Sequence, residues 1–242
     1  MNKPFFFFAC ILFSFQVKGQ DVYHDSTALV ILDKVAEYVG ELNSLKFQAK
    51  IEEDVAFSEA FLIKEFRTAE ITFQGSSQMA AKITQQGKDN FYFYNGKQLV
   101  YFNLEGNYFA AGDAPDNTLD MLDWLNESFG VHLVLADFLY PNFTSNLMES
   151  MDYLEFLGTT TVDGQKTFHI GGANQDLTFQ IWISQDFQPR PLKALLTYLG
   201  EPYARQIEVT FDNWEINQEY PNSMFEFLPG PNSKQIIWTK KN

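Results

Sequence analysis

Apolar and polar residues alternate along two long neighbouring stretches, residues 45–57 and 61–75. Glu53 interrupts the apolar side of the first stretch, and Glu65 and Arg67 interrupt that of the second. The apolar side carries Leu45, Phe47, Ala49, Ile51, Val55, Phe57, Phe61, Ile63, Ala69, Ile71 and Phe73. A period of two over this length predicts antiparallel strands with one wet face. The charged residues in the second stretch indicate either a β-bulge or the wet mouth of a concave surface.

Residues 26–43 have helical periodicity instead. The charged residues share one narrow stripe and are Asp33, Lys34, Glu37 and Glu41. Ser26 is a candidate N-cap, and Gly40 or Asn43 can end the helix. An ordinary surface helix has a narrower apolar stripe than this one. We therefore expect the helix to be largely covered, for example inside a curved sheet.

Turn residues divide the rest of the chain into shorter strands and a helical block. Asn95-Gly96, Glu105-Gly106-Asn107 and Asp163-Gly164 are hairpin turn signals, so consecutive strands should form meanders. The helical pieces span residues 117–129, 132–140 and 142–151. The shorter strands are expected at residues 79–84, 91–94, 98–102, 107–111, 153–162, 167–170, 177–184, 192–199 and 205–216. An irregular tail then leads to a short segment at residues 236–238. About ten or eleven strands in one domain, residues 20–242, predict a mainly β (α+β) fold whose sheet curls or closes.

Residues 1–19 have the pattern of a signal peptide. Lys3 precedes an apolar run from Phe5, and the run leads to small residues before a cleavage site after Gly19. The run is shorter than the roughly 20 residues that a membrane span needs. We therefore expect export to the periplasm and no stable membrane anchor after cleavage. A lipid anchor at Cys10 is the less favoured alternative, because the apolar stretch before it is short.

Composition excludes several classes of protein. The chain has 31 acidic and 17 basic residues and a formal net charge of −14, whereas a nucleic-acid-binding protein needs a basic footprint. The same charge disfavours docking on anionic membrane surfaces. The single cysteine excludes a Cys-based zinc site. Because that cysteine lies in the expected signal peptide, the mature chain must rely on packing rather than on disulfides.

Groups suited to catalysis are scarce. Of the three histidines, His24 is expected at a loose solvated terminus, His132 at a helix start, and His169 in a hydrogen bond to Gln180 across the sheet. No G-x-S-x-G elbow, phosphate loop or H-E-x-x-H motif occurs. Carboxylates near the helix start at residue 117 are typical of caps rather than of calcium sites. We expect no catalytic residue, metal or cofactor, and a hydrolase with paired carboxylates stays open as an alternative.

Short motifs follow one another in a fixed order along the chain. They are Phe93-Tyr94-Asn95-Gly96-Lys97, Leu135-Ala136-Asp137, Leu157-Gly158, Gly164, His169, Gln180-Ile181-Trp182-Ile183, Pro189-Arg190-Pro191-Leu192-Lys193, Gly200-Glu201-Pro202-Tyr203, Trp214 and Phe225-Glu226-Phe227-Leu228-Pro229. Over about residues 26–237 this order resembles the predicted periplasmic protein family called domain of unknown function 2092, which is similar in fold to the outer-membrane lipoprotein carriers LolA and LolB. The resemblance implies a half-open antiparallel β-barrel with helices covering its concave face and a hydrophobic cavity inside.

The resemblance and the apolar faces together suggest a function. We expect a non-enzymatic periplasmic protein that binds an apolar ligand, a lipid or a lipoprotein acyl chain, in the barrel cavity. An adaptor for an envelope protein on the same fold is the alternative. The cavity candidates are Phe47, Ile51, Ile63, Phe73, Phe179 and Ile181 on strands and Trp124 and Phe138 on helices, with Glu65 and Arg67 at the cavity mouth. A register slip of one residue would reverse the strand assignments.

Overall fold

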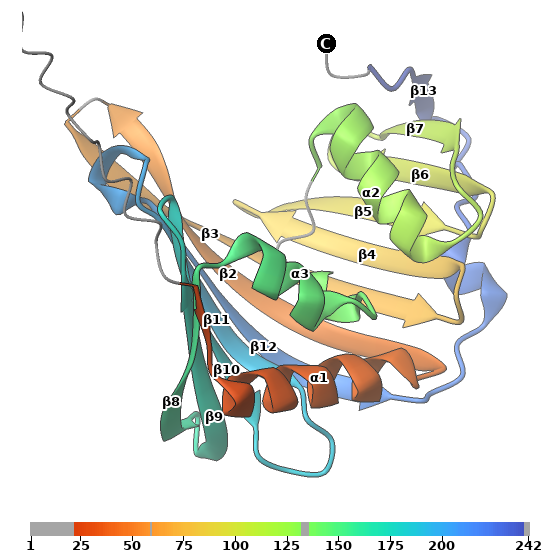
Figure 1. Cartoon of the computed structure of the whole chain (residues 1–242). Helices are drawn as coiled ribbons and strands as arrows, with labels where there is room; N and C mark the ends of the chain where they lie inside the picture. The colour runs from red at the N-terminus through yellow and green to blue at the C-terminus, as the bar shows by residue number, and fades with distance from the viewer. Residues whose placement is uncertain (1–21, 59, 132–135, 240–242) are drawn as a thin grey trace, which may run out of the picture.

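One curved sheet with helices on its concave side makes up the protein (Figure 1). The computed structural model describes residues 22–58, 60–131 and 136–239. The expected signal peptide, His132 and Leu135 lie outside these residues. The sheet curls without closing, because its two outermost strands do not pair with each other. The fold is therefore mainly β, as the strand pattern predicts, and half open, as the family resemblance implies.

Two antiparallel meanders form most of the sheet and meet where β12 pairs with β2. The first meander consists of β2 (Ser44–Ser58), β3 (Phe61–Gln74), β4 (Gln78–Gln85), β5 (Lys88–Tyr94), β6 (Gln98–Asn103) and β7 (Tyr108–Asp113). The second consists of β8 (Tyr153–Val162), β9 (Gln165–Ala173), β10 (Leu177–Ser184), β11 (Pro191–Tyr198) and β12 (Gln206–Ile216). Gly96 and Gly164 have φ of 85° and 79° at two of the hairpins. These values confirm the turns that the sequence predicts, since glycine adopts positive φ without steric cost.

Two short edge strands were missed by the sequence analysis. The described residues form thirteen strands rather than ten or eleven, and the additional edge strands are β1 (Tyr23–His24) and β13 (Lys234–Ile236). They pair in parallel with β8 and β7, so the sheet is mixed at its edges. A strand of two or three residues is too short to show a hydrophobic period. The expectation of a loose terminus at His24 was also wrong, because its Nε2 lies 2.9 Å from the carbonyl oxygen of Met151.

Helix α1 (Ser26–Gly40) lies along the concave side, as its wide apolar stripe predicts. Its buried residues are Ala28, Ile31, Leu32, Val35, Ala36 and Val39. The helix ends at Gly40, but its N-cap is Asp25 rather than Ser26. The Asp25 carboxylate accepts a hydrogen bond from the backbone N–H of Thr27 at 2.7 Å and another from Phe156 of β8 at 3.3 Å. One side chain therefore caps the helix and ties it to the sheet.

The helical block between the meanders lies on the same concave side as α1 (Figure 1). It contains α2 (Thr118–Phe129), the 3-10 turn η1 (Ala136–Leu139) and α3 (Phe143–Ser150). Asn117 caps α2, and Gly130 ends it with a φ of 68°, as expected from the sequence. None of the described helices combines the length and apolar character needed to cross a membrane.

The first part of the C-terminal segment, up to Phe227, packs on the opposite, convex side of the first meander (Figure 1). It includes η3 (Asn222–Phe225), whereas η2 (Pro202–Ala204) lies between β11 and β12. Phe225 is buried. The ring of Phe227 lies within 5.7 Å of the rings of Phe93, Phe102 and Phe109. This segment therefore covers outward-facing aromatic residues that would otherwise be exposed.

Candidate functional site: two apolar cavities under the helices

The first cavity lies between α3 and the strands β10, β11 and β12. Its volume is about 320 Å³, and we call it the α3 cavity. Its apolar lining consists of Phe138, Phe143, Leu147, Met151, Leu177, Phe179, Ile181, Pro191, Ala194, Leu196 and Phe211. The polar lining is limited to Asp137, Ser150, Asn174 and Gln180. An aromatic and aliphatic lining with few polar groups is typical of sites for apolar small molecules.

A glycine on β9 positions Phe179 in this cavity. Phe179 lies opposite Gly172 in the pairing of β10 with β9. A Cβ atom built on Gly172 would lie 2.1 Å from Cε1 of Phe179. The ring can therefore lie across the neighbouring strand only because residue 172 has no side chain.

A packed aromatic cluster borders the α3 cavity. The ring of Phe47 lies 4.9 Å from that of Trp214, 5.8 Å from that of Phe211 and 5.9 Å from that of Phe138. Strict alternation would turn Trp214 away from Phe211, but β12 has a register shift between Asp212 and Glu215. This irregularity places Trp214 on the concave side with Phe211. The concave face is thus partly filled and partly hollow.

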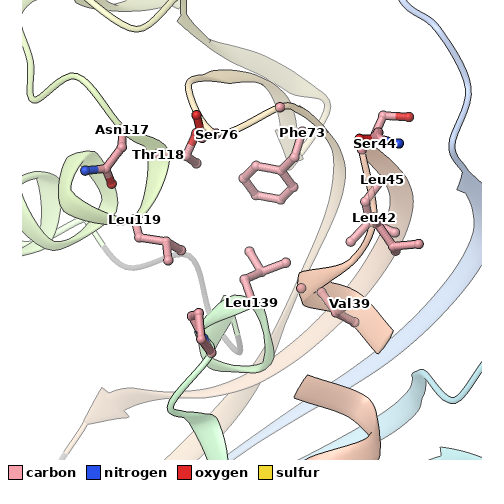
Figure 2. Close-up of a pocket in the computed structure, with 14 residues that line it drawn as sticks. Val39, Leu42, Ser44, Leu45, Phe73, Ser76, Asn117, Thr118, Leu119 and Leu139 are labelled. Carbon is pink, nitrogen blue, oxygen red and sulfur yellow. The ribbon is translucent and has the colours of Figure 1, made fainter. Parts of the chain in front are cut away.

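The second cavity lies between the end of α1, the start of α2 and the turn from β3 to β4 (Figure 2). Its volume is about 380 Å³, and we call it the α2 cavity. Figure 2 shows Phe73 and Leu139 pointing toward each other, with Leu119 on one side and Leu42 and Leu45 on the other. Ser76, Asn117 and Thr118 lie together at one end. This cavity therefore has an apolar part and a polar part.

The turn η1 separates the two cavities. Phe138 lines the α3 cavity, and the next residue, Leu139, lines the α2 cavity. The two hollows are therefore neighbours in the same layer, beneath one helical block. Each can be altered by substitutions that do not touch the lining of the other.

Ion pairs lie on the concave face toward the free end of β2 and β3. Glu53 is paired with Arg67 and with Arg205, whose Nη1 lies 3.0 Å from Glu53 Oε1. Arg205 Nε also donates to Glu201 at 2.6 Å. This hydrogen bond holds the pKa of Glu201 below its usual value and raises the pKa of Arg205. The side chains of Glu53, Arg67 and Arg205 are 21–28% exposed, so this network is half-buried.

Comparison with known proteins places the chain in a family. Residues 28–238 match the family described as "Predicted periplasmic protein (DUF2092)". The chain belongs to this family. It is therefore a periplasmic protein, as its resemblance to the family implied. No curated protein matches the chain in sequence.

Several solved structures are similar to this family member. An uncharacterized conserved protein from Thermus thermophilus is 12% identical, with a TM-score of 0.51 over 88% of this chain and 99% of that one. The lipoprotein LppX of Mycobacterium tuberculosis is 15% identical, with a TM-score of 0.48 over 81% and 98%. A LolA superfamily protein from Nitrosomonas europaea is 14% identical, with a TM-score of 0.34 over 83% and 97%. At such identities the likeness concerns the fold alone.

Four of the expected cavity residues line a cavity in this DUF2092 protein. Phe138, Phe179 and Ile181 line the α3 cavity, and Phe73 lines the α2 cavity. Phe211 was missed, although it continues the inward alternation of Ile207 and Val209 along β12. That alternation was the signal that would have found it.

The other expected cavity residues lie elsewhere. Phe47 and Ile51 are buried in the packed core. Ile63 is 38% exposed on the end of β3. Trp124 packs against Phe129 and Trp238, with ring centroids 5.1 and 6.5 Å away. None of these four residues lines the α2 or the α3 cavity.

Glu65 and Arg67, which were expected at the cavity mouth, do not line the α2 cavity or the α3 cavity. Arg67 belongs to the ion network described above, and Glu65 accepts a hydrogen bond from Gln85 at 2.8 Å. The register of β2 with β3 is regular at both residues, and its only shift lies between Ala56 and Ser58. The charged residues on β3 therefore do not mark a bulge.

His169 has the structural role that its sequence position suggests. Its Nε2 lies 2.9 Å from Oε1 of Gln180, and its ring stacks on Trp182 at 4.5 Å.

Within the described part of the chain, no group of three or more His, Cys, Asp or Glu residues is placed to hold a metal ion.

Proposed function

We propose that this periplasmic protein binds an apolar ligand, a lipid or an acyl chain, in the α3 cavity and does so without chemical conversion. The observation that supports this most is the lining of the cavity. Strands β10, β11 and β12 form one wall, and the residues from η1 to the end of α3 form the other. Both walls are largely apolar. The cavity volume of about 320 Å³ lies at the small end of the range of about 300–1,000 Å³ for ligand sites.

The hydrophobic effect supplies the binding energy for such a ligand. Each methylene that leaves water contributes about 0.8 kcal/mol. A short stretch of acyl chain in the α3 cavity therefore binds without a specific polar contact. The ligand also fills space beside Phe138 and Phe211 that the side chains leave empty.

The arrangement of acidic residues gives less support to a hydrolase. Glycoside hydrolysis needs two carboxyl groups on either side of the scissile bond. Among the described residues, Asp137 is the one acid that lines the α3 cavity, and none lines the α2 cavity. Glu37, Glu41 and Asp186 line an outer groove beside α1, where Asp186 is paired with Arg190 at 3.2 Å.

Filling the α3 cavity tests the proposal. Ala194 is 2% exposed and lines the cavity, so Ala194→Trp should occupy it and abolish uptake of a fluorescent fatty-acid probe. Ala194→Leu fills less of the space and should weaken uptake while perturbing the fold less. Ala56→Trp, at an exposed position on β2, is the matched control and should bind like the wild type. Circular dichroism would confirm that each variant is folded.

Two results would contradict the proposal. One is wild-type protein, purified from the periplasm, that shows no lipid by native mass spectrometry and takes up no probe. The other is unchanged uptake by folded Ala194→Trp, which would place the ligand elsewhere.

The exposed end of β2 and β3 favours a second candidate function, that of an adaptor for an envelope protein. The pairing of β12 with β2 ends at Glu53, and that of β4 with β3 ends at Arg67. Beyond these residues the two strands pair with each other. Phe57 and Phe61 are 66% and 49% exposed there, and their rings stack with centroids 5.1 Å apart. Exposed apolar patches of this kind often mark contact sites.

The two functions can be separated experimentally. A double variant, Phe57→Ser with Phe61→Ser, should lose a cross-linked envelope partner if the adaptor function is correct, while its probe uptake stays at the wild-type level. Retention of the partner by this variant would argue against the adaptor function.

A further inference from the structure

The α2 cavity is lined by polar and apolar side chains but by no charged one. Its polar side chains are Asn43, Ser44, Ser76, Asn117 and Thr118, and none of its lining residues is acidic or basic. Its apolar part is formed by Leu42, Leu45, Phe73 and Leu139 among others. A hollow with this division suits a molecule that has an apolar chain and an uncharged polar end.

Thr118 carries a buried hydroxyl in this cavity with unused hydrogen-bonding capacity. Its side chain is 7% exposed, and within the described part of the chain its buried Oγ1 has no hydrogen-bond partner. Buried polar atoms are normally satisfied, so such an atom needs an explanation. The backbone N–H of Thr118 donates to the carbonyl oxygen of Ser76 at 2.7 Å, which fixes the position of the residue at the cavity wall.

Two neighbouring polar side chains, Ser44 and Asn117, already have partners within the protein. The hydroxyl of Ser44 donates to the carbonyl oxygen of Gln218 at 2.5 Å. Oδ1 of Asn117 accepts from the backbone N–H of Asp120 at 2.9 Å. The Thr118 hydroxyl is therefore the buried group that gains most from a ligand. Threonine populates two χ1 rotamers in a helix, so a change from one staggered rotamer to the other can turn this hydroxyl toward the cavity.

We infer that the α2 cavity binds the uncharged ester or amide end of an acyl amphiphile, with the Thr118 hydroxyl donating to its carbonyl oxygen. The acyl chain then lies against Phe73 and Leu139. A monoacylglycerol is the simplest molecule with these features.

Electrostatics at the start of α2 disfavours an anionic head. Asp116 and Asp120 lie next to the cavity residues Asn117 and Thr118 in the sequence. Burial is the main cause that raises the pKa of Tyr94 to about 12, and these two carboxylates add to the rise. A buried carboxylate needs a compensating partner, and the cavity lining includes no lysine or arginine.

Binding of monooleoylglycerol and of oleate tests this inference. Wild-type protein should bind monooleoylglycerol more tightly at neutral pH. Thr118→Val keeps the shape of the side chain and removes the hydroxyl, so it should weaken monooleoylglycerol binding by about five-fold, the effect of one neutral hydrogen bond. Thr144→Val is the matched control. Thr144 is also 7% exposed with a buried, unpartnered Oγ1, but it lies on α3 outside the α2 cavity lining.

The two threonine variants separate a ligand contact from a structural effect. Both should fold at least as stably as the wild type, because each loses a buried unsatisfied hydroxyl. Equal affinity of Thr118→Val and wild type for monooleoylglycerol would overturn the inference, as would tighter binding of oleate.

This site and the proposed function can fail independently. Monooleoylglycerol binding that survives in Ala194→Trp and falls in Thr118→Val supports the α2 site, even if the α3 cavity takes up no probe. Binding that is lost in Ala194→Trp and unchanged in Thr118→Val places the probe in the α3 cavity and contradicts the α2 site. If wild-type protein binds neither monooleoylglycerol nor the fluorescent fatty-acid probe, both the α2 site and the proposed function of the α3 cavity are contradicted.

Discussion

At the scale of single residues, the absence of one side chain shapes the α3 cavity. Gly172→Ala would place a Cβ atom 2.1 Å from the Phe179 ring, so the ring must move off β9. We expect a loss of about 1–3 kcal/mol in the free energy of unfolding, as is typical of overpacking, and weaker uptake of the fatty-acid probe. Denaturant unfolding and probe titration would measure the two effects.

Gly112→Ala provides the control for this substitution. Gly112 also lies in a strand, and a Cβ atom there would meet nothing within 4 Å. Alanine at this position should stabilise the protein by at most about 1 kcal/mol, through the lower entropy of the unfolded chain. An equal loss of probe uptake in both variants would show that the close approach of Phe179 to Gly172 does not control the cavity.

Glu53 is the second residue whose role can be isolated. Glu53→Gln would remove the carboxylate that binds both Arg67 and Arg205. Arg67 contacts it through Nη2, and its buried Nε has no hydrogen-bond partner among the described residues. Exposed pairs contribute at most about 1 kcal/mol, and breaking buried ones costs about 3–5 kcal/mol. We expect a loss of about 2 kcal/mol for this half-buried network, measured by denaturant unfolding.

Lys50→Gln offers a comparison at an exposed ion pair. Lys50 binds Asp212 at 2.6 Å, but its side chain is 61% exposed. Its loss should cost less than about 1 kcal/mol. If Glu53→Gln and Lys50→Gln lower the free energy of unfolding by the same small amount, the Glu53 network does not stabilise the end of the sheet.

At the scale of elements, we expect the attachment of α1 to the sheet to depend on pH. The hydrogen bond from the backbone N–H of Thr27 lowers the pKa of Asp25 below its ordinary 3.8, against the effect of burial. A lowered folded-state pKa means that the stabilisation is complete above the unfolded value and is lost as the pH falls through the folded value. Asp25→Asn keeps a cap and removes this titration.

We therefore expect the stability advantage of wild type over Asp25→Asn to shrink as the pH is lowered from about 5 to about 3. Thermal unfolding of both proteins at several pH values would measure it. A difference that stays constant over this interval would mean that the Asp25 charge does not contribute to the cap.

The hydrophobic period of a strand predicts the face on which a side chain lies, but not what surrounds that side chain. Phe47, Ile63 and Phe73 all belong to the apolar side of their strands. Phe73 lines the α2 cavity, whereas Phe47 is covered by Trp214 and Phe211. Ile63 lies on the part of β3 that does not pair with β4. These outcomes depend on pairing length and on the β12 irregularity, which no local pattern contains.

At the scale of the whole molecule, turns and alternation were sufficient to predict the two meanders. Asn95-Gly96 and Asp163-Gly164 mark hairpins regardless of tertiary context, and the wide stripe of α1 predicts a covered helix. The cavities were less predictable, because a hollow depends on residues distant in sequence. The α3 cavity needs Gly172 beneath Phe179 and α3 above Phe211, and no single segment specifies both.

The opposite faces of the sheet should have separable roles, stability on the convex side and ligand binding on the concave side. Phe225 is 1% exposed in the C-terminal segment, so Phe225→Ala should cost about 3–5 kcal/mol. Leu228→Ala, at a residue that is 87% exposed, should change stability by less than about 0.5 kcal/mol. Because Phe225 lines neither cavity, the Phe225→Ala protein should retain wild-type affinity for the fatty-acid probe at temperatures where it is folded. Weaker binding by this folded variant would mean that the C-terminal segment holds the curvature of the sheet, on which the cavities depend.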